Sequence, residues 1–572
     1  MRIRQSIITL SATDLANHLS CHHLTTLDHR LAKGELPEPI WDNPHLVVLQ
    51  QRGLEHERAY IEVLRSKGLG VIDLSDEPEE TAINATRTAM EGGEQVIVQG
   101  SLAAGGWRGR ADVILRVEQS SGLGEWSYEV VDCKLARETK AETILQLCLY
   151  SELIAEIQGS DPEYLHVIRP GTDFQPESYR FASFAAYHRS VKEALRSAIE
   201  APVITYPEPV SHCEVCRWWK ECDKQRRADD HLSFVAGASR LQRKELVAQG
   251  VPTLAALATL PLPVSFKPAR GSTESYVRIR EQARIQFEAR VEARLKFESL
   301  RTEPSEGLAR LPQPSPGDIF LDFEGDPFVG EGGLEYLTGV ITADEHGTLS
   351  YEGRWALNRT QELAAFEWFI AFTFDRLARY PDLHIYHYAS YETSAIKRLM
   401  LRYATQEEEV DRLLRGGVFI DLHAIIKQGV RASVEQYSLK EIEKFCDFRR
   451  RVVLQEANQA RHFIEHQLEL SPAPQLTDAA CKLVEGYNED DCRATERVRN
   501  WLETVRTELI ASGMDLPRPQ AKDAAPNEDA SALQLRIAAL FEALTRDLPV
   551  EPADRNKGTG GALASRARPW LA

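Results

Sequence analysis

The first part of the chain alternates between short apolar runs and one longer amphipathic segment. Three runs rich in Val, Ile and Leu occupy residues 95–102, 109–117 and 128–134. Runs of this length and composition predict strands. Residues 139–157 place apolar side chains at helical spacing, and residues 164–168 return to a strand pattern. The pattern therefore predicts a βββαβ unit, which belongs to the α/β class.

A second α/β pattern begins at residue 318 with the apolar run DIFLDF. Two more strand-like runs follow at residues 335–342 and 349–357, each after a turn that contains glycine. The spacing then predicts a helix at residues 360–380 and a strand at residues 384–388. Three antiparallel strands followed by a helix and a further strand form the element order of an RNase H-like fold.

The segment between these two patterns is predicted to be a helical connector. Residues 240–260 predict two short helices, either a plain helical hairpin or a helix-hairpin-helix whose glycine turn offers backbone N–H groups to a phosphate. Residues 274–300 predict a charged, solvated helix, and the proline-rich residues 301–317 predict a linker. Beyond the second pattern, residues 532–548 predict one amphipathic helix in an otherwise loose tail.

A chain of 572 residues is too long for one domain. We predict a multi-domain α/β protein with four segments: 1–230, 231–317, 318–512 and 513–572. Hydrophobic residues make up 43% and charged residues 27% of the chain, as in globular proteins. No apolar run is long enough for a membrane span or a signal peptide, so we expect a cytoplasmic protein with no membrane partner.

The formal net charge of −18 argues against broad, nonspecific adhesion to nucleic acid. It does not exclude a nuclease, because metal sites concentrate carboxylates. The first region carries such a pattern in EVVDCKL, where Asp132 and Lys134 lie two apart on one face of a strand. Asp112 lies on the preceding strand, and Gln146 and Tyr150 lie four apart on one helix face. This constellation favours a divalent metal site.

The order of these motifs resembles the RecB-like branch of the PD-(D/E)xK nucleases. The resemblance implies a restriction-endonuclease-like α/β/α domain in which His56, Asp112 and Asp132 bind Mg²⁺ or Mn²⁺. His56 lies on a helix expected at about residues 46–67. Lys134 would orient the attacking water or stabilise the phosphorane charge, with Gln146 and Tyr150 completing the motif. The residue inside the signature is Cys133, whose side chain matters little in this family.

A cysteine cluster follows in HCEVCRWWKEC, with Cys213, Cys216 and Cys222 close together and Cys21 far upstream. In a cytoplasmic chain this spacing indicates a metal rather than disulfides. It resembles the iron–sulphur nucleases among RecB-like enzymes, which implies a 4Fe–4S cluster on all four cysteines. Zinc is the alternative, with His212 able to replace Cys21.

Aromatic and basic side chains surround the cysteine cluster. The tryptophans Trp218 and Trp219 either shield the cluster or stack on single-stranded nucleic acid. Nearby cations are candidates for phosphate contact: Lys220, Lys224, Arg226 and Arg227.

The second region has its own acidic signature. Asp322 and Glu324 lie two apart on the strand that opens the pattern, and Glu392 opens a later helix. Tyr487 and Asp491 lie one helical turn apart in YNEDD. The set resembles the tyrosine-containing DEDD exonucleases, and in particular the YprB-like RNase H-fold family. It implies four carboxylates that hold two metals, with Tyr487 orienting the attacking water.

Three neighbouring features leave choices open. Asp490 beside Asp491 makes the fourth ligand ambiguous, and the spacing from Tyr487 favours Asp491. Asp421 is interpreted as structural. Ser438 and Glu441 predict a capping box, and the basic run at residues 449–451 predicts either a phosphate contact or a solvated turn.

Together these motifs predict a metal-dependent nuclease with two active sites, most simply a DNA exonuclease of repair or foreign-DNA processing. One alternative is a scaffold that binds nucleic-acid ends with one or both sites silent. Another is an RNA-processing 3′–5′ exonuclease that uses only the second region. The sequence contains no P-loop motif for ATP. Chains that resemble this one often continue into a helicase, so this chain is interpreted as a truncated or free-standing version, and a helicase supplied in trans is a candidate partner.

Overall fold

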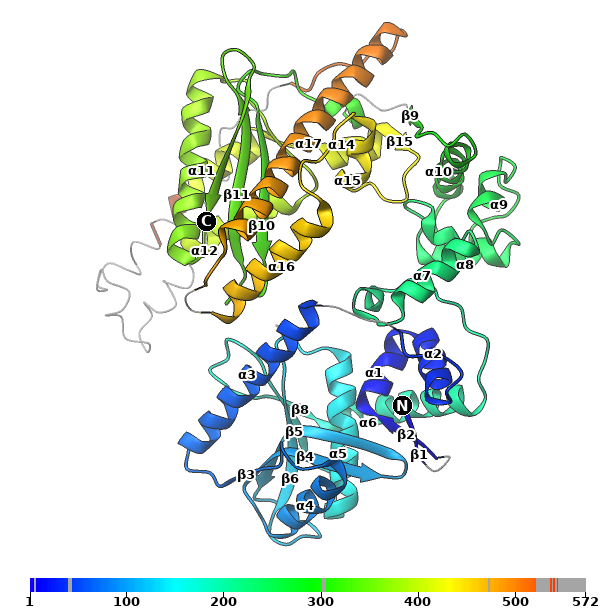
Figure 1. The fold of residues 1–572 in the computed structure, drawn as a ribbon, viewed down its shortest axis with the longest axis vertical. Helices are drawn as coiled ribbons and strands as arrows, with labels where there is room; N and C mark the ends of the chain where they lie inside the picture. The colour runs from blue at the N-terminus through cyan, green and yellow to red at the C-terminus, as the bar shows by residue number, and fades with distance from the viewer. Residues whose placement is uncertain are drawn as a thin grey trace. The chain divides into compact units, whose positions relative to one another are not determined.

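The computed structural model describes residues 1–4, 7–39, 44–136, 138–300, 305–330, 332–471 and 474–520, with five isolated positions between residues 535 and 543. The chain forms two compact units, Met1–Ser233 and Phe234–Ala572 (Figure 1). In the described residues no helix combines the length and the apolar character that a membrane crossing requires. The predicted tail helix at residues 532–548 lies outside the described residues except for those five positions.

The first unit is a mixed sheet with helices on both faces. Its strands are β1 (Arg2–Arg4), β2 (Ile7–Ser11), β3 (Val71–Asp73), β4 (Val96–Ala104), β5 (Trp107–Val117), β6 (Ser127–Cys133), β7 (Tyr164–Ile168) and β8 (Glu177–Arg180). Its helices are α1 (Ala12–Ser20), α2 (His22–Ala32), α3 (Pro44–Ser66), α4 (Glu79–Glu91), α5 (Ala141–Gln158), α6 (Phe181–Glu200) and α7 (Trp219–Ala228). Strands β4, β5 and β6 are antiparallel neighbours, and β7 continues the sheet parallel to β6.

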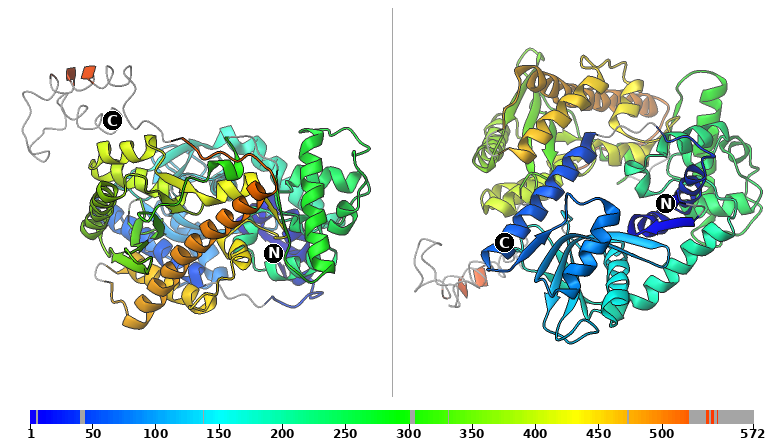
Figure 2. Two further views of the ribbon diagram at one scale, coloured as in Figure 1. Left: turned by 90° about the horizontal axis from the view of Figure 1, so that it is seen from above. Right: turned by 60° about the horizontal axis from the view of Figure 1, so that its bottom comes forward.

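Alternation along β6 distributes its side chains between two hydrophobic cores. Val130 packs in the core that α5 covers, and Val131 packs in the core that α3 covers. Asp132 therefore shares the α5 face with Val130. Figure 2 shows the strands of this sheet together with the long helix α3. The predicted βββαβ unit is confirmed, with ends that differ from the predicted ones by at most two residues.

The second unit contains a five-stranded sheet and a helical region before it. Its strands are β9 (Phe297–Ser299), β10 (Ile319–Asp326), β11 (Leu334–Ala343), β12 (Leu349–Trp355), β13 (Ile385–His387), β14 (Phe419–Asp421) and β15 (Val430–Ala432). Its helices are α8 (Arg240–Ala248), α9 (Leu254–Ala258), α10 (Thr273–Val291), α11 (Arg359–Arg379), α12 (Tyr391–Tyr403), α13 (Glu407–Arg415), α14 (Leu422–Gly429), α15 (Leu439–Ile442), α16 (Leu454–Leu470) and α17 (Asp478–Ala511).

The sheet of the second unit runs in the order β12-β11-β10-β13-β14. The first three strands are antiparallel, and β13 and β14 join β10 in parallel. Alternation along β10 sends Ile319, Leu321 and Phe323 into a core shared with α11 and α12. Phe320 points into the opposite core, which α14 and α17 cover. Figure 1 shows α17 crossing this face of the sheet.

The connector differs from its prediction in two places. The charged helix predicted for residues 274–300 ends at Val291, because Ala293 adopts a left-handed conformation with φ of 50°. The following residues form β9, which pairs with β15. The predicted linker also contributes to a core, since Leu308 and Leu311 are buried below α14. Its residues 301–304 lie outside the described residues.

Candidate functional site

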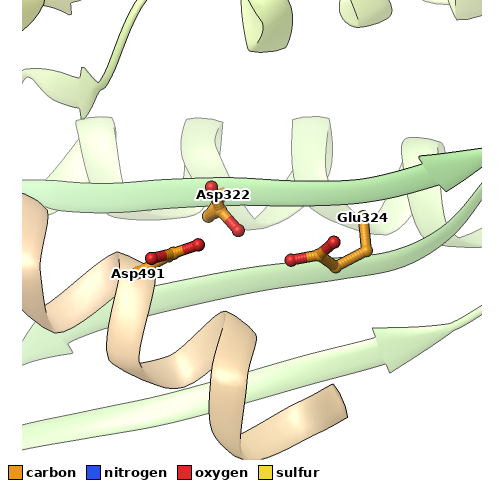
Figure 3. Close-up of side chains that lie close together, drawn as sticks. All are labelled: Asp322, Glu324 and Asp491. Atoms are coloured by element: carbon orange, nitrogen blue, oxygen red, sulfur yellow. The ribbon is translucent and has the colours of Figure 1, made fainter. Parts of the chain in front are cut away.

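Three carboxylates meet on the α17 face of the second unit's sheet. Asp322 and Glu324 leave β10 on the same side as Phe320, because residues two apart on a strand share a face. Asp491 approaches them from α17 (Figure 3). One ligand oxygen from each lies within 4.8 Å of the others. Among the described residues, this is the only set of three or more His, Cys, Asp or Glu side chains this close together.

A glycine allows α17 to approach the sheet at this point. Gly339 on β11 lies opposite Asp322, and a Cβ at Gly339 would lie 1.7 Å from Asn488 Oδ1. The missing side chain lets the Asn488 amide donate to Asp322 Oδ2 at 2.8 Å and to the Asp322 carbonyl at 3.2 Å. Tyr351 donates to Asn488 Oδ1 at 2.9 Å and fixes the amide orientation. Helix α17 is therefore hydrogen-bonded to the strand that carries two of the three carboxylates.

The three carboxylates have little access to water and repel one another. Glu324 and Asp491 are buried, and Asp322 is half-buried. Burial raises the pKa of Asp322 well above its ordinary value, and the nearby Asp491 and Glu324 raise it further. Burial also raises the pKa of Glu324, and the opposing effect of Arg461 is smaller. The full set of negative charges therefore needs a cation. Closely spaced carboxylate oxygens are the ligands that Mg²⁺ and Mn²⁺ prefer, so the residues present fit such an ion.

Two arginines partly balance this charge. Arg450 donates to Asp491 at 2.6 Å and to both oxygens of Glu443 at 2.8 and 2.7 Å. Arg461 lies 3.2 Å from Glu324. The basic run at residues 449–451 is thus neither a solvated turn nor open to phosphate at Arg450, because Arg450 is held in a buried ion pair. Arg450 stays in this pair because its carboxylate partners are buried and would otherwise lack a counter-charge.

Tyr487 lies at the centre of a group of cations. Its ring is 3% exposed, and Lys440 Nζ donates to its hydroxyl oxygen at 2.6 Å. The Lys440 ammonium and the guanidinium carbons of Arg450 and Arg461 lie 5.1, 5.6 and 5.6 Å from the ring centroid. Burial raises the pKa of the Tyr487 hydroxyl, and Asp491 and Glu324 add to the effect. The hydroxyl is therefore protonated at neutral pH.

The other predicted acids of this region have different surroundings. Glu392 is buried outside the close set, and its Oε2 lies 3.4 Å from His387 Nδ1 without a hydrogen bond. Its negative charge still contributes to the raised pKa of Asp322. Asp490 turns away from the site, because its carboxylate accepts from the backbone N–H groups of Arg451 and Val452. The geometry thus brings Asp491, not Asp490, to the other acids.

Two further predictions concern residues near this site. Asp421 is structural, since it caps α14 through Ala424 N–H and also accepts from Ala389 N–H. The capping box predicted at Ser438 is wrong: the Ser438 side chain makes no capping hydrogen bond, and the helix it precedes is only four residues long.

The first unit brings four of its predicted residues into one network. Lys134 Nζ lies 2.8 Å from Asp132 Oδ2, and Gln146 donates to Asp132 Oδ1 at 3.2 Å. Lys134 also donates to Gln146 Oε1, and the Gln146 amide lies 3.3 Å from the Tyr150 hydroxyl. Asp132 is 1% exposed, and burial followed by repulsion from Asp112 raises its pKa. Lys134 provides a counter-charge to Asp132 within the network.

Asp112 lies where two strands separate. Strands β5 and β6 pair from Val117↔Ser127 to Val113↔Val131, so their pairing ends beside Asp112. Beyond that point the Asp112 carboxylate accepts the Cys133 N–H at 2.9 Å. A side-chain oxygen therefore takes the place of a strand carbonyl, and it holds Asp112 next to Asp132.

His56 has a different set of neighbours. Its Nε2 donates to the Ile168 carbonyl at 3.2 Å, and its ring stacks on Phe174 at 5.5 Å. This bond leaves Nδ1 as the ring's acceptor, which is the usual state of a metal-ligating histidine. The next residue, Glu57, was not predicted, yet its buried carboxylate is close enough to Asp112 for their repulsion to raise its pKa. Gln99, at φ of 53°, donates to Glu57 at 2.6 Å.

The four predicted cysteines line one small cavity of the first unit. Leu24, Leu27 and Trp218 complete its apolar wall. None of the four forms a disulfide. Burial raises the pKa of Cys216 to about 11 and that of Cys222 to about 12, with repulsion from the other cysteines adding to it. The thiols of Cys216 and Cys222 are therefore protonated at neutral pH, so a metal that binds them must displace protons.

The aromatic and basic neighbours of the cysteines have distinct roles. Trp218 is buried against them and donates to Asp28 at 2.8 Å, so it shields the cavity. Trp219 is 43% exposed, and Lys220 is exposed as well. Arg226 is buried and paired with Asp223, so it is not available to a phosphate, whereas the Arg227 side chain on the same carboxylate is 54% exposed.

Sequence reasoning missed the residues that support the second unit's acids. Asn488 lies inside the quoted YNEDD run, so its position between Tyr487 and Asp491 was an available signal. Lys440, Arg450 and Arg461 lie far from that run in sequence. Their contacts depend on how α15, α16 and α17 pack, which no local pattern encodes.

The comparisons with known proteins agree with this geometry in part. A search of curated proteins returned no match. Residues 319–503 match the family model described as the RNase_H superfamily. The match includes Asp322, Glu324 and Asp491, which are able to hold a metal of the kind that RNase H-like nucleases use. Residues 319–503 are therefore similar to the RNase H superfamily, which has a nuclease-type fold, and the observed strand order agrees with this similarity.

Proposed function

We propose that the second unit is a metal-dependent 3′–5′ exonuclease that acts on DNA. The observation that carries this proposal is the set of three carboxylates, Asp322, Glu324 and Asp491, within 4.8 Å of one another. Mg²⁺ or Mn²⁺ held there would activate water for attack on a phosphodiester and stabilise the leaving oxygen. Asn488 holds Asp322 in place, and Tyr487 presents its hydroxyl beside the acids.

The test is hydrolysis of end-labelled single-stranded DNA, double-stranded DNA and RNA by the full chain with Mn²⁺. Asp322→Asn is expected to lower the rate by about 1,000-fold, because the metal supplies several kcal/mol of stabilisation. Glu352→Gln is the matched control, since Glu352 is a 45% exposed carboxylate on the same sheet. Equal rates for Asp322→Asn and wild type would rule out this site. Preferential cleavage of RNA would support the RNA-processing alternative, and binding without cleavage would support a scaffold.

A second candidate nuclease site is the Asp132 network of the first unit. The hydrogen bonds that join Asp132, Lys134, Gln146 and Tyr150 favour it. Here Lys134 would stabilise charge on the phosphate. If both sites act, Asp132→Asn removes the cleavage that remains in Asp322→Asn protein. If Asp322→Asn alone removes all cleavage of every substrate, the first unit does not hydrolyse them.

We propose an iron–sulphur cluster for the four cysteines, with zinc as the alternative. A zinc ion with Zn–S bonds of about 2.3 Å draws its thiolates to about 3.8 Å apart. No three of these sulphurs lie within 4.8 Å of one another in the described residues, and a multi-iron cluster spaces its thiolates more widely than one ion does. Protein purified without air should be brown and contain iron. A colourless protein with stoichiometric zinc would contradict the cluster.

The helicase partner stays a prediction.

A further inference from the structure

Lys440 differs from the other two cations around Tyr487. Arg450 and Arg461 are each directed at carboxylates. Lys440 is half-buried, and within the described residues its one hydrogen bond goes to the Tyr487 hydroxyl oxygen, at 2.6 Å. It is the cation that meets the polar end of the ring.

The direction of this hydrogen bond is fixed by chemistry. A lysine ammonium has donors and no acceptor, so the Tyr487 oxygen must accept from it. The hydroxyl hydrogen of Tyr487 is then directed to another partner. The carboxylates on this side of the ring are Asp491, one helical turn after Tyr487 on α17, and Glu324, which is paired with the Arg461 that lies over the ring.

The backbone before Lys440 is held firmly. Tyr388 donates its hydroxyl hydrogen to the Tyr437 carbonyl at 2.7 Å. The Tyr437 hydroxyl in turn accepts from Ala432 N–H at 3.0 Å and donates to Gln282 at 2.9 Å. Lys440 lies three residues later on α15, so its ammonium is delivered from an anchored segment.

We propose that Lys440 is a positioning residue of the second unit's site, which orients the Tyr487 hydroxyl so that its hydrogen points toward the carboxylates. The inference rests on the proposed nuclease function. Lys440 acts through Tyr487: it holds the hydroxyl in the orientation that an attacking water between tyrosine and carboxylates requires. A residue that instead bound the substrate phosphate directly would act independently of Tyr487.

The test compares Lys440→Met, Lys440→Arg, Tyr487→Phe and the double variant Lys440→Met/Tyr487→Phe in the full chain. With Mn²⁺ and end-labelled single-stranded DNA, Lys440→Met is expected to lower kcat by about 10- to 100-fold, the usual effect of a hydrogen bond to a charged group. KM should stay nearly constant, and Lys440→Arg should restore part of kcat. The double variant should match Tyr487→Phe. Lys444→Met is the control, because that neighbouring lysine is exposed and pairs with Glu441.

Additive losses in the double variant, or a Lys440→Met effect confined to KM, would overturn the proposal. A second measurement does not depend on catalysis. In protein labelled with ¹³C at tyrosine Cζ, the resonance missing from Tyr487→Phe belongs to Tyr487. It should shift in Lys440→Met and return toward its position in Lys440→Arg. An unmoved Tyr487 resonance in Lys440→Met would refute the positioning role, even if the protein were inactive. The proposed nuclease function is tested separately, by the loss of activity in Asp322→Asn.

Discussion

The two acidic centres of this protein solve the problem of buried charge differently. In the first unit Asp132 has an ammonium partner from the same strand end, Lys134, and an amide partner, Gln146. In the second unit three carboxylates converge, and their cations come from other elements. The first centre thus takes its cation from the same strand end but keeps more carboxylates than cations, because Asp112 and Glu57 lie beside Asp132. The second centre takes its cations from other elements.

This difference bears on metal binding. An excess of buried negative charge is costly without a cation, and it favours a divalent ion strongly. Each centre contains a lysine, Lys134 in the first and Lys440 in the second, but among the described residues only the second brings three carboxylate oxygens within 4.8 Å of one another. We therefore expect a stronger structural response to metal in the second unit than in the first.

The largest expected effect concerns the buried cation of the second centre. Arg450 and its partners Glu443 and Asp491 have side chains that are each 9% exposed. Arg450→Met should cost about 3–5 kcal/mol, because it leaves two buried carboxylates without a partner. Arg493→Met is the control, since Arg493 forms a more exposed pair with Glu489 on the same helix, worth about 0.5 kcal/mol. Hydrogen exchange of α17 in urea measures both, and equal costs would contradict the proposed role of burial.

The next effect concerns the glycine under Asn488. Gly339→Ala should cost about 1–3 kcal/mol, because the new Cβ would meet Asn488 Oδ1 at 1.7 Å and push α17 from the sheet. Gly53→Ala on α3 has no heavy atom within 4 Å of its Cβ, so it should be neutral or stabilising. Thermal unfolding compares the two. If Gly339→Ala is as stable as wild type, the close approach of helix and sheet is not required.

The pH dependence of metal-free protein should report on the second centre when wild type is compared with an Asp322 variant. The folded state raises the pKa of Asp322 and Glu324, so it binds more protons than the unfolded state between about pH 4 and the raised pKa values. The free energy of unfolding therefore falls as pH rises through that window. The loss is about 1.4 kcal/mol for each pKa unit by which folding raises the pKa of a carboxylate. Mn²⁺ should reverse the loss. Asp322→Asn should weaken both the pH slope and the Mn²⁺ effect, measured by thermal unfolding; an unchanged slope would exclude this origin.

The smallest effect tests two helix starts of the second unit. Thr477 caps α17, because its hydroxyl accepts from Ala480 N–H at 3.2 Å. Thr477→Ala should cost about 1 kcal/mol. Ser438→Ala should cost less than about 0.5 kcal/mol, because the Ser438 hydroxyl makes no capping bond. Urea unfolding checks the pair, and a reversed order would restore the capping box at Ser438.

Periodicity predicted the strands and helices at residues 95–168 and 318–388, because these elements have one- or two-sided apolar patterns. Alternation along β10 predicted that Asp322 and Glu324 share a face, and the structure adds that this face meets α17. The helix end at Val291 was missed, since it depends on the left-handed Ala293 and on pairing of β9 with β15. The burial of Leu308 and Leu311 was not predicted, because the proline content of residues 301–317 indicated a linker.

The residues of the candidate sites also divide into those that the sequence predicted and those that it did not. Residues close in sequence, such as Asp132 and Lys134, were predicted as a set because their spacing fixes their relation. Arg450 was interpreted as part of a basic turn because its partners Glu443 and Asp491 lie on other elements. Charge patterns along the chain do not reveal which cations become buried; that depends on which helices pack together.

The YNEDD run on α17 has little tolerance for a change in chain length. Tyr487 meets Lys440, Asn488 meets Asp322, Glu489 pairs with Arg451 and Arg493, Asp490 holds the turn at residues 451–452, and Asp491 faces the acids. Each residue of a helix turns by about 100° from the one before it. A single deletion between Tyr487 and Asp491 would therefore turn these two side chains about 100° out of their shared register, so that both could not keep their partners.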